Sequence, residues 1–173
     1  MLNEIADSSI LAIEELKRNV DAAALHRAVE MLDGARSIHV VGYRPASWVA
    51  AGLFDGLTQL GCRCHRIVSP ANSALRTVSA LGADDLLLTI CFSDDDDSAV
   101  RVAAAAQARK VPVLAFAHRI DHPLASVSSL FMAIPASPES KFEPWAARMM
   151  FAQALILALE KRRAGQQRGG SGW

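Results

Sequence analysis

Two short stretches hold the residues whose types and spacing could do chemistry: four consecutive carboxylates at positions 94–97, and the pair His118 and His122. Carboxylates can hold Mg²⁺ or Ca²⁺, but consecutive residues point in different directions and rarely complete one coordination shell. The alternative interpretation is structural: Asp97 caps the helix that follows, and its acidic neighbours favour the positive end of the helix dipole. We therefore predict no metal site and no cofactor.

Arg44 is the cation that can form an ion pair with these carboxylates. It stands in a loop after a short apolar run, and it can either pair with Asp94 or Asp96 or clamp an anionic ligand with two guanidinium nitrogens. His118 and His122 follow another apolar run. They either contact a ligand or pack within their loop or in an interface.

The elements that must position these residues follow from the spacing of apolar side chains. Short apolar runs predict five strands, at 37–41, 62–67, 85–92, 113–117 and 129–134. Helical stretches between and after them predict helices at 47–60, 73–81, 98–110 and 144–163. Two helical segments come first; Ser8 or Ser9 can cap the first and Asp21 the second. His39 and His65 fall within strands and are interpreted as satisfied structural histidines.

Each connection between predicted strands is long enough for a crossover. We therefore predict an α/β fold, a three-layer αβα sandwich with a five-stranded parallel sheet, of flavodoxin or Rossmann type and preceded by two helices. Ligands of such sheets bind outside the carboxyl ends of the strands, which selects the loops at 42–47, 93–98 and 118–123. The expected organisation is a helical segment at 1–34, a domain at 35–163 and a flexible tail at 164–173.

Composition narrows the function classes. The chain has 173 residues, 51% of them hydrophobic and 21% charged, which excludes a disordered chain. Lys and Arg number 18, as do Asp and Glu, so the formal net charge is zero. DNA-binding domains usually carry a basic excess, so this chain alone is a poor candidate for binding DNA. A neutral protein repels itself little, which favours self-association.

The three cysteines, Cys62, Cys64 and Cys91, lack zinc-type spacing and are predicted to be reduced. The N-terminus shows no signal-peptide pattern, and the longest apolar stretch, at 152–159, is far shorter than the ~18–20 residues of a membrane span. We expect a cytoplasmic protein without a membrane partner.

The segments around the three loops resemble sugar isomerase (SIS) domains. ARSIHVVG at 35–42 resembles the family's A-x-x-I-x-V-x-G, and GADDLLLTI at 82–90 resembles G-x-x-D-L-L-I-x-I-S. VPVLAFA at 111–117, followed by HPLA, is similar to V-P-V-I-A-I-T … S-P-L-A. GYRPASWVA at 42–50 approaches G-x-R-x-S-x-x-V-A, the variant of RpiR/MurR-type transcriptional regulators, whose effector domain is the nearest resemblance.

The resemblance implies a phosphate held by Ser and Thr hydroxyls and by amides at helix N-termini. Its implied ligand contacts are Arg44, Ser47, Ser93, Asp94, Asp96, Ser98, His118 and His122. This sequence departs from the pattern at Ala46, which stands where the family has Ser, and at Asp94 and Asp96, which replace Gly and Thr. Like charges repel, so the acidic run either only caps a helix or marks a changed ligand that is cationic, amino-bearing or metal-bridged.

The resemblance implies the sensing domain of an RpiR-like regulator, which binds a phosphosugar or amino-sugar derivative and dimerises or tetramerises. Such a regulator contacts DNA only through a separate helix-turn-helix domain, which this chain lacks. An aldose–ketose isomerase is the alternative, and its base would be Glu139, Glu143, His65 or His118. A degenerate dimerisation scaffold is the third. None of these bases lies in a catalytic motif of the family, so we predict no catalytic residue and no isomerase activity.

Overall fold

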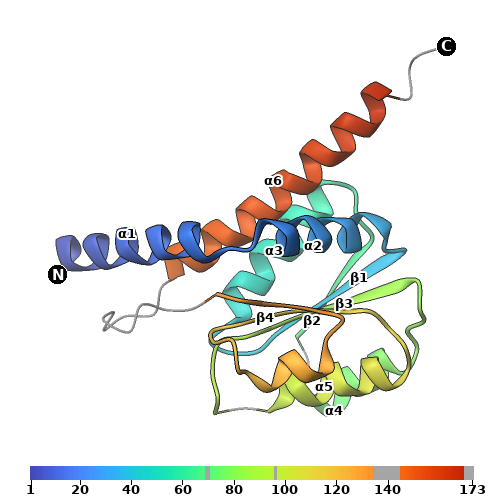
Figure 1. The fold of residues 1–173 in the computed structure, drawn as a ribbon. Coiled ribbons are helices and arrows are strands. Elements are labelled where there is room, and N and C mark those ends of the chain that lie inside the picture. The colour runs from blue at the N-terminus through green and yellow to red at the C-terminus, as the bar shows by residue number, and fades with distance from the viewer. Residues whose placement is uncertain (69–70, 96, 135–144, 170–173) are drawn as a thin grey trace.

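A computed structural model describes residues 1–68, 71–95, 97–134 and 145–169. Five parallel strands form one sheet in the order β2-β1-β3-β4-β5, which confirms the predicted fold class (Figure 1). The strands are β1 (Ser37–Gly42), β2 (Cys64–Ile67), β3 (Asp85–Cys91), β4 (Val113–Ala117) and β5 (Leu130–Ala133). The chain builds outward from β1 to β2 and then returns to β3 on the other side, so the strand order switches between β1 and β3.

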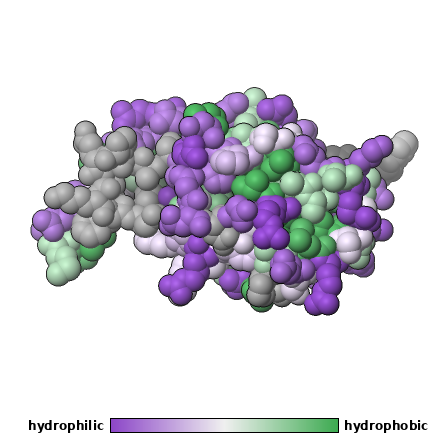
Figure 2. Space-filling view, turned by 90° about the horizontal axis from the view of Figure 1, so that it is seen from below, coloured by the Kyte–Doolittle hydropathy of each residue, from purple (hydrophilic) through white to green (hydrophobic). Residues whose placement is uncertain are grey.

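Helices cover both faces of this sheet (Figure 1). One layer contains α1 (Leu2–Asn19), α2 (Ala22–Gly34), α3 (Ser47–Gln59) and α6 (Trp145–Gly169). The other contains α4 (Ala71–Val78), α5 (Ser98–Ala108) and the 3₁₀ helix η1 (Pro123–Val127). Every residue of β3 is buried, as expected of a central parallel strand covered on both faces. The outer face on the side of α4 and α5 is largely hydrophilic, with a smaller hydrophobic area (Figure 2).

Of the predicted helix caps, the structure confirms Asp21. Asp21 caps α2, and its carboxylate accepts a hydrogen bond from the Ala23 amide at 2.8 Å. The prediction that Ser8 or Ser9 caps the first helix is wrong, because α1 already begins at Leu2 and both serines lie inside it. Its first turns carry few buried side chains and project from the body (Figure 1), so apolar periodicity could not mark its start. Asp97 occupies the cap position of α5, but its side chain makes no capping hydrogen bond.

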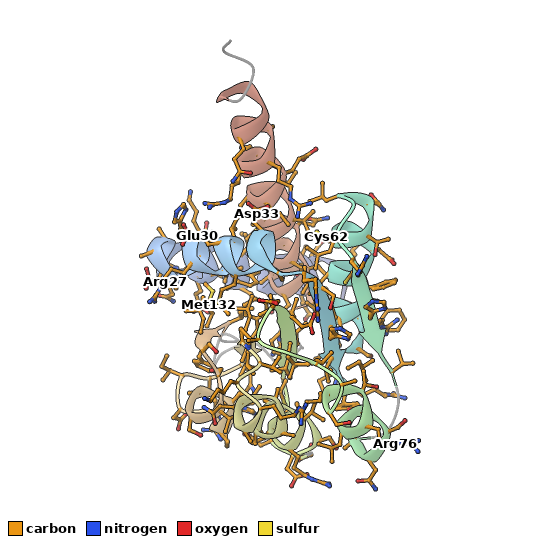
Figure 3. The ribbon with its side chains drawn as sticks, turned by 90° about the vertical axis from the view of Figure 1, so that its right-hand side faces the viewer. Arg27, Glu30, Asp33, Cys62, Arg76 and Met132 are labelled. Atoms are coloured by element: carbon orange, nitrogen blue, oxygen red, sulfur yellow. The ribbon has the colours of Figure 1, made fainter. Side chains whose placement is uncertain are left out.

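Helix α6 runs six residues past the predicted end at 163 and reaches Gly169, so part of the expected flexible tail is helical. Asp33 of α2 holds these last turns (Figure 3). Its carboxylate accepts from Arg162 at 3.1 Å, from Arg163 at 2.9 Å and from Gln166 at 3.1 Å. Positions 170–173 lie outside the described residues.

Helices α3 and α6 approach closely at a glycine. A side chain at Gly56 would overlap the end of Ile156, so the missing Cβ lets the two helices pack together. Met149, about two turns before Ile156 on α6, packs in the same way over Gly52. A Cβ at Gly52 would lie 2.8 Å from the terminal methyl carbon of Met149. This contact fixes α6 against the helix that follows β1.

No helix of the described residues is both long and apolar enough to cross a membrane.

Thr89, in the middle of β3, is fully buried, and its hydroxyl has no hydrogen-bond partner among the described residues. Thr89→Val keeps the side-chain shape and removes this unpaired hydroxyl, so we expect the free energy of unfolding to rise by about 1 kcal/mol. Thermal melts should show a Tm about 2–4 °C higher. Thr58→Val is the control, because that exposed hydroxyl donates to the Phe54 carbonyl at 2.7 Å and its loss should not raise Tm. A Tm for Thr89→Val at or below the wild-type value contradicts the prediction.

Candidate functional site

The carboxyl ends of β1, β3 and β4 lie side by side. Gly42 at the end of β1 pairs with Ile90 in β3, and Cys91 at the end of β3 pairs with Ala117 at the end of β4. The loops that follow these strands therefore leave the sheet at the same edge, next to the switch in strand order. In open α/β sheets this edge is where ligands bind.

Asp94, in the loop after β3, is the centre of an ion-pair cluster at this edge. Arg119 donates from Nε to both carboxylate oxygens, at 3.2 and 3.3 Å, and from Nη2 to Oδ1 at 3.0 Å. His118 Nε2 lies 3.3 Å from Oδ2. The hydrogen bonds from Arg119, with the charge of His118, hold the pKa of the Asp94 carboxyl below its ordinary value. The acidic run thus has a compensating cation beside it.

That cation is not the one predicted. Arg44 is exposed, and within the described residues no hydrogen bond or ion pair joins it to Asp94. Both β1 and β4 lie beside β3, so strand order alone does not choose between the two arginines; the path of the loop after β4 brings Arg119 to Asp94. Asp96, the other predicted partner of Arg44, lies outside the described residues.

Arg119 is held from a second side. Its Nη1 atom lies 2.7 Å from the carboxylate of Asp121, so the guanidinium sits between two carboxylates. Hydrogen bonds to Asp94 and then to Asp121 raise the pKa of Arg119 above its ordinary value. The side chain keeps a fixed orientation while remaining partly open to solvent.

His122 is a buried structural link between two loops. Its Nδ1 accepts from the Leu124 amide at 3.2 Å, which caps η1. Because Nδ1 accepts, the proton of the neutral ring stands on Nε2, which lies 3.9 Å from the Asp94 oxygen Oδ1. Burial, and then the charge of His118, lowers the pKa of His122 and keeps it neutral. The hydrogen bond to the Leu124 amide lies within the loop after β4.

Asp94, His118 and His122 bring three possible metal-ligand atoms within 4.8 Å of one another. Their chemistry does not fit a metal ion. The Nε2 atom of His122 carries a proton because Nδ1 is already an acceptor, and a protonated nitrogen has no lone pair to donate. The Asp94 carboxylate is engaged by Arg119 as well. The three residues are arranged as an ion-pair cluster and not as a coordination shell.

The three predicted serines lie at the same edge in different settings. The Ser93 hydroxyl closes a local turn: it accepts from the Asp95 amide at 3.1 Å and lies 3.2 Å from the Asp95 carboxylate. Ser98 is the first residue of α5 and is half-buried. Ser47 is the first residue of α3, with Ala46 at the cap position, and its carbonyl accepts from Arg66 of β2 at 3.1 Å. Ser47 is therefore not the cap of its helix.

Comparison with known proteins identifies the family. The family model for the SIS domain matches residues 31–158. The chain belongs to the SIS domain family. A search of curated proteins finds no match.

Solved structures share the fold of this SIS domain at low sequence identity. The Vibrio vulnificus NanR protein, complexed with ManNAc-6P, is 20% identical with a TM-score of 0.86, over 96% of this chain and 64% of that chain. The sugar isomerase domain of an RpiR transcription factor from Sphaerobacter thermophilus is 21% identical with a TM-score of 0.86, over 94% and 90%. Phosphoheptose isomerase GmhA from Neisseria gonorrhoeae is 16% identical with a TM-score of 0.73, over 88% and 93%. The SIS domain here thus spans less than two thirds of NanR, and its structural neighbours include regulators and isomerases.

Arg148 of the SIS domain was missed by sequence reasoning. It lies in the first part of α6, is only 1% exposed, and its guanidinium stands 4.0 Å above the ring of Phe92, the residue after β3. A cation over an aromatic face is attracted by the ring electrons. The signal available in the sequence was a lone Arg inside the apolar segment AARMMF at 146–151. Arg148 brings a buried positive charge to the carboxyl end of the sheet.

A second polar cluster of the SIS domain lies at the opposite, amino end of β1. His39 stacks on His65 with ring centroids 4.9 Å apart, and its Nε2 lies 3.0 Å from the Ser37 hydroxyl. That hydroxyl donates to Asp85 at 2.7 Å, so it accepts from His39. The Nδ1 atom of His39 is buried without a partner among the described residues, so the expectation of a satisfied histidine is wrong for this atom. The neighbouring edge strand β2 places the ring of His65 against His39, and this stacked ring donates no hydrogen bond to Nδ1.

Proposed function

We propose that this SIS domain is the ligand-sensing part of an RpiR-like transcription regulator. In this proposal it binds a phosphosugar or amino-sugar derivative at the carboxyl edge of the sheet and does not isomerise it. The resemblance of the loop after β1 to that of RpiR/MurR-type regulators supports this function. The fold shared with the NanR protein, which is complexed with ManNAc-6P, supports the ligand class.

The observation that carries the proposal is the state of the acid–base groups at this edge. An isomerase needs a base free to take a proton from a carbon next to a carbonyl. The Nδ1 atom of His122 accepts from the Leu124 amide, and its Nε2 atom carries the proton, so neither nitrogen is free as a base. His118 is paired with Asp94 through Nε2, and its Nδ1 atom is buried away from any ligand at this edge. His65 is exposed on β2 and stacked on His39, and the two pair within the strands and not in the loops of the carboxyl edge. Glu139 and Glu143, the remaining predicted bases, lie outside the described residues.

Self-association is part of the proposal. Large apolar side chains are exposed on the first helix and around the starts of α3 and α6: Leu2, Ile10, Leu11, Trp48 and Trp145. Exposed apolar surface of this kind favours contact with a second copy. In the proposed regulator, this domain works in the cytoplasm as a homodimer or tetramer, and DNA is bound by a separate helix-turn-helix domain.

Two measurements on the same protein test this function. A thermal-shift panel of phosphosugars and amino-sugar phosphates should contain at least one compound that raises Tm, because a ligand at 100 times its Kd stabilises the native state by about 2.7 kcal/mol. Isomerase assays with fructose 6-phosphate, hexulose 6-phosphate and sedoheptulose 7-phosphate should give no turnover. Turnover of any of these substrates would show that the protein is an isomerase and not a sensor. If no compound raises Tm and no substrate is turned over, the result favours a dimerisation scaffold.

A further inference from the structure

The side chains around Asp94 hold its carboxylate in the way that they would hold a bound anion. The Nε and Nη2 atoms of Arg119 make a two-pronged contact with the carboxylate, and His118 Nε2 approaches the oxygen Oδ2 from another direction. Guanidinium groups bind carboxylates and phosphates through this same fork, since both anions present two oxygens at matching spacing. The donors that receive Asp94 are therefore suited to an external anion.

We propose that Arg119 and His118 form an anion site for the phosphate group of a ligand, and that the carboxylate of Asp94 occupies this site in the free protein. The inference rests on the proposed function, because it assigns the phosphate of the sensed ligand to these two residues. It differs from both earlier interpretations of the acidic run, a helix cap and a changed ligand. Asp94 is a built-in competitor that an arriving anion displaces.

The site is accessible, and its occupant is weakly held. Asp94 is 54% exposed and Arg119 is 37% exposed. Exposed ion pairs contribute little to stability, because water solvates both charges when they separate. A phosphate dianion carries more charge than a carboxylate and has a third oxygen for a further donor. A phosphate at sufficient concentration can therefore displace Asp94 from these donors.

The donors keep their places when Asp94 leaves. Asp121 holds Nη1 of Arg119 at 2.7 Å from the side away from Asp94. The buried His122 accepts from the Leu124 amide at 3.2 Å and so orders the loop after β4, which carries both donors. Its ring also meets the His118 ring edge to face at 5.5 Å. The anion site is thus prepared by contacts that do not depend on Asp94.

Titration with inorganic phosphate tests this site on the full chain. Asp94→Asn keeps the size of the side chain and removes the competing charge, so we expect it to bind phosphate at least ten times more tightly than wild type. The control is Asp97→Asn, which removes a carboxylate of the same run that makes no capping bond, and we expect less than a threefold change. Adding Arg119→Gln to Asp94→Asn should abolish the gain. Heteronuclear NMR can follow Arg119 Nε and His118 during each titration.

Equal phosphate affinity in wild type and Asp94→Asn overturns the proposal, as does a gain that survives Arg119→Gln. Asp94→Ser is a second variant, and a failure of both to gain affinity has the same meaning. The result is separable from the test of the proposed function. If Asp94→Asn gains phosphate affinity while no phosphosugar shifts Tm in any variant, the anion site stands and the sensor fails. If a phosphosugar binds wild type, and Asp94→Asn and Arg119→Gln leave its affinity unchanged, the sensor stands and the anion site fails.

Discussion

Replacing Asp85 by alanine is expected to lower the free energy of unfolding by about 2–4 kcal/mol, because the change leaves the Ser37 hydroxyl and the Gly82 amide without their acceptor. Asp85 is 3% exposed at the start of β3, and its carboxylate accepts from the Ser37 hydroxyl at 2.7 Å and from the Gly82 amide at 2.9 Å. Arg36 donates to both oxygens, at 3.1 and 2.7 Å. The Ser37 hydroxyl in turn accepts from His39, so the loss extends one residue further into the sheet.

Urea unfolding at neutral pH measures this effect. Asp84→Ala is the matched control: it removes the neighbouring carboxylate, which is exposed, so it should change the free energy of unfolding by less than about 0.5 kcal/mol. If Asp85→Ala costs no more than Asp84→Ala, the network around Asp85 does not stabilise the fold.

The same carboxylate predicts a pH dependence with a definite sign. The hydrogen bonds from Arg36, followed by those from Gly82 and Ser37, hold the pKa of Asp85 far below its ordinary value. The stability that the ionised group contributes is therefore complete above its unfolded pKa, near pH 4, and is lost as pH falls toward the folded pKa. Asp85→Asn should flatten the decline between pH 4 and pH 2 relative to wild type.

Gly42→Ala is expected to destabilise the protein by about 1–3 kcal/mol, the usual cost of overpacking a site that cannot retreat. A Cβ at Gly42 would lie 2.7 Å from the Cβ of Ala50 and 3.1 Å from the carbonyl oxygen of Ala46. Both belong to the first turns of α3 or its cap, so no flexible side-chain end can move aside. The start of α3, with Ser47, must shift away from β1.

A pair of thermal melts checks this prediction. Gly34→Ala is the control, because a Cβ there meets nothing within 4 Å and Gly34 ends a helix; Ala in that position should leave Tm unchanged or raise it slightly. A Tm for Gly42→Ala equal to that of wild type would show that α3 accommodates the methyl group without cost.

The arrangement of strands and helices could be predicted because each apolar pattern is local. The run at 85–92 is apolar almost throughout, and it forms the fully buried β3. Asp21 precedes a helical period and caps α2. The parallel sheet then places the loops after β1, β3 and β4 at one edge, which is how Asp94, His118 and His122 meet.

The partners within that edge could not be predicted, because they depend on the path that each loop takes after it leaves the sheet. Arg44 and Arg119 both follow strands that flank β3, and only the path of each loop decides which reaches Asp94. The tautomer of His122 is likewise fixed by the hydrogen bond from the Leu124 amide, and no sequence pattern predicts this contact. The first helix was predicted, but its start at Leu2 was not, because its outer half has no buried residue to give a period.

The close approach of α3 and α6 at Gly56 makes two distant positions share one volume. Ile156 fills the space that a side chain at position 56 would need. A larger residue at position 56 therefore requires a smaller residue at position 156. The contact thus couples the size of the side chains at two positions that 100 residues of chain separate.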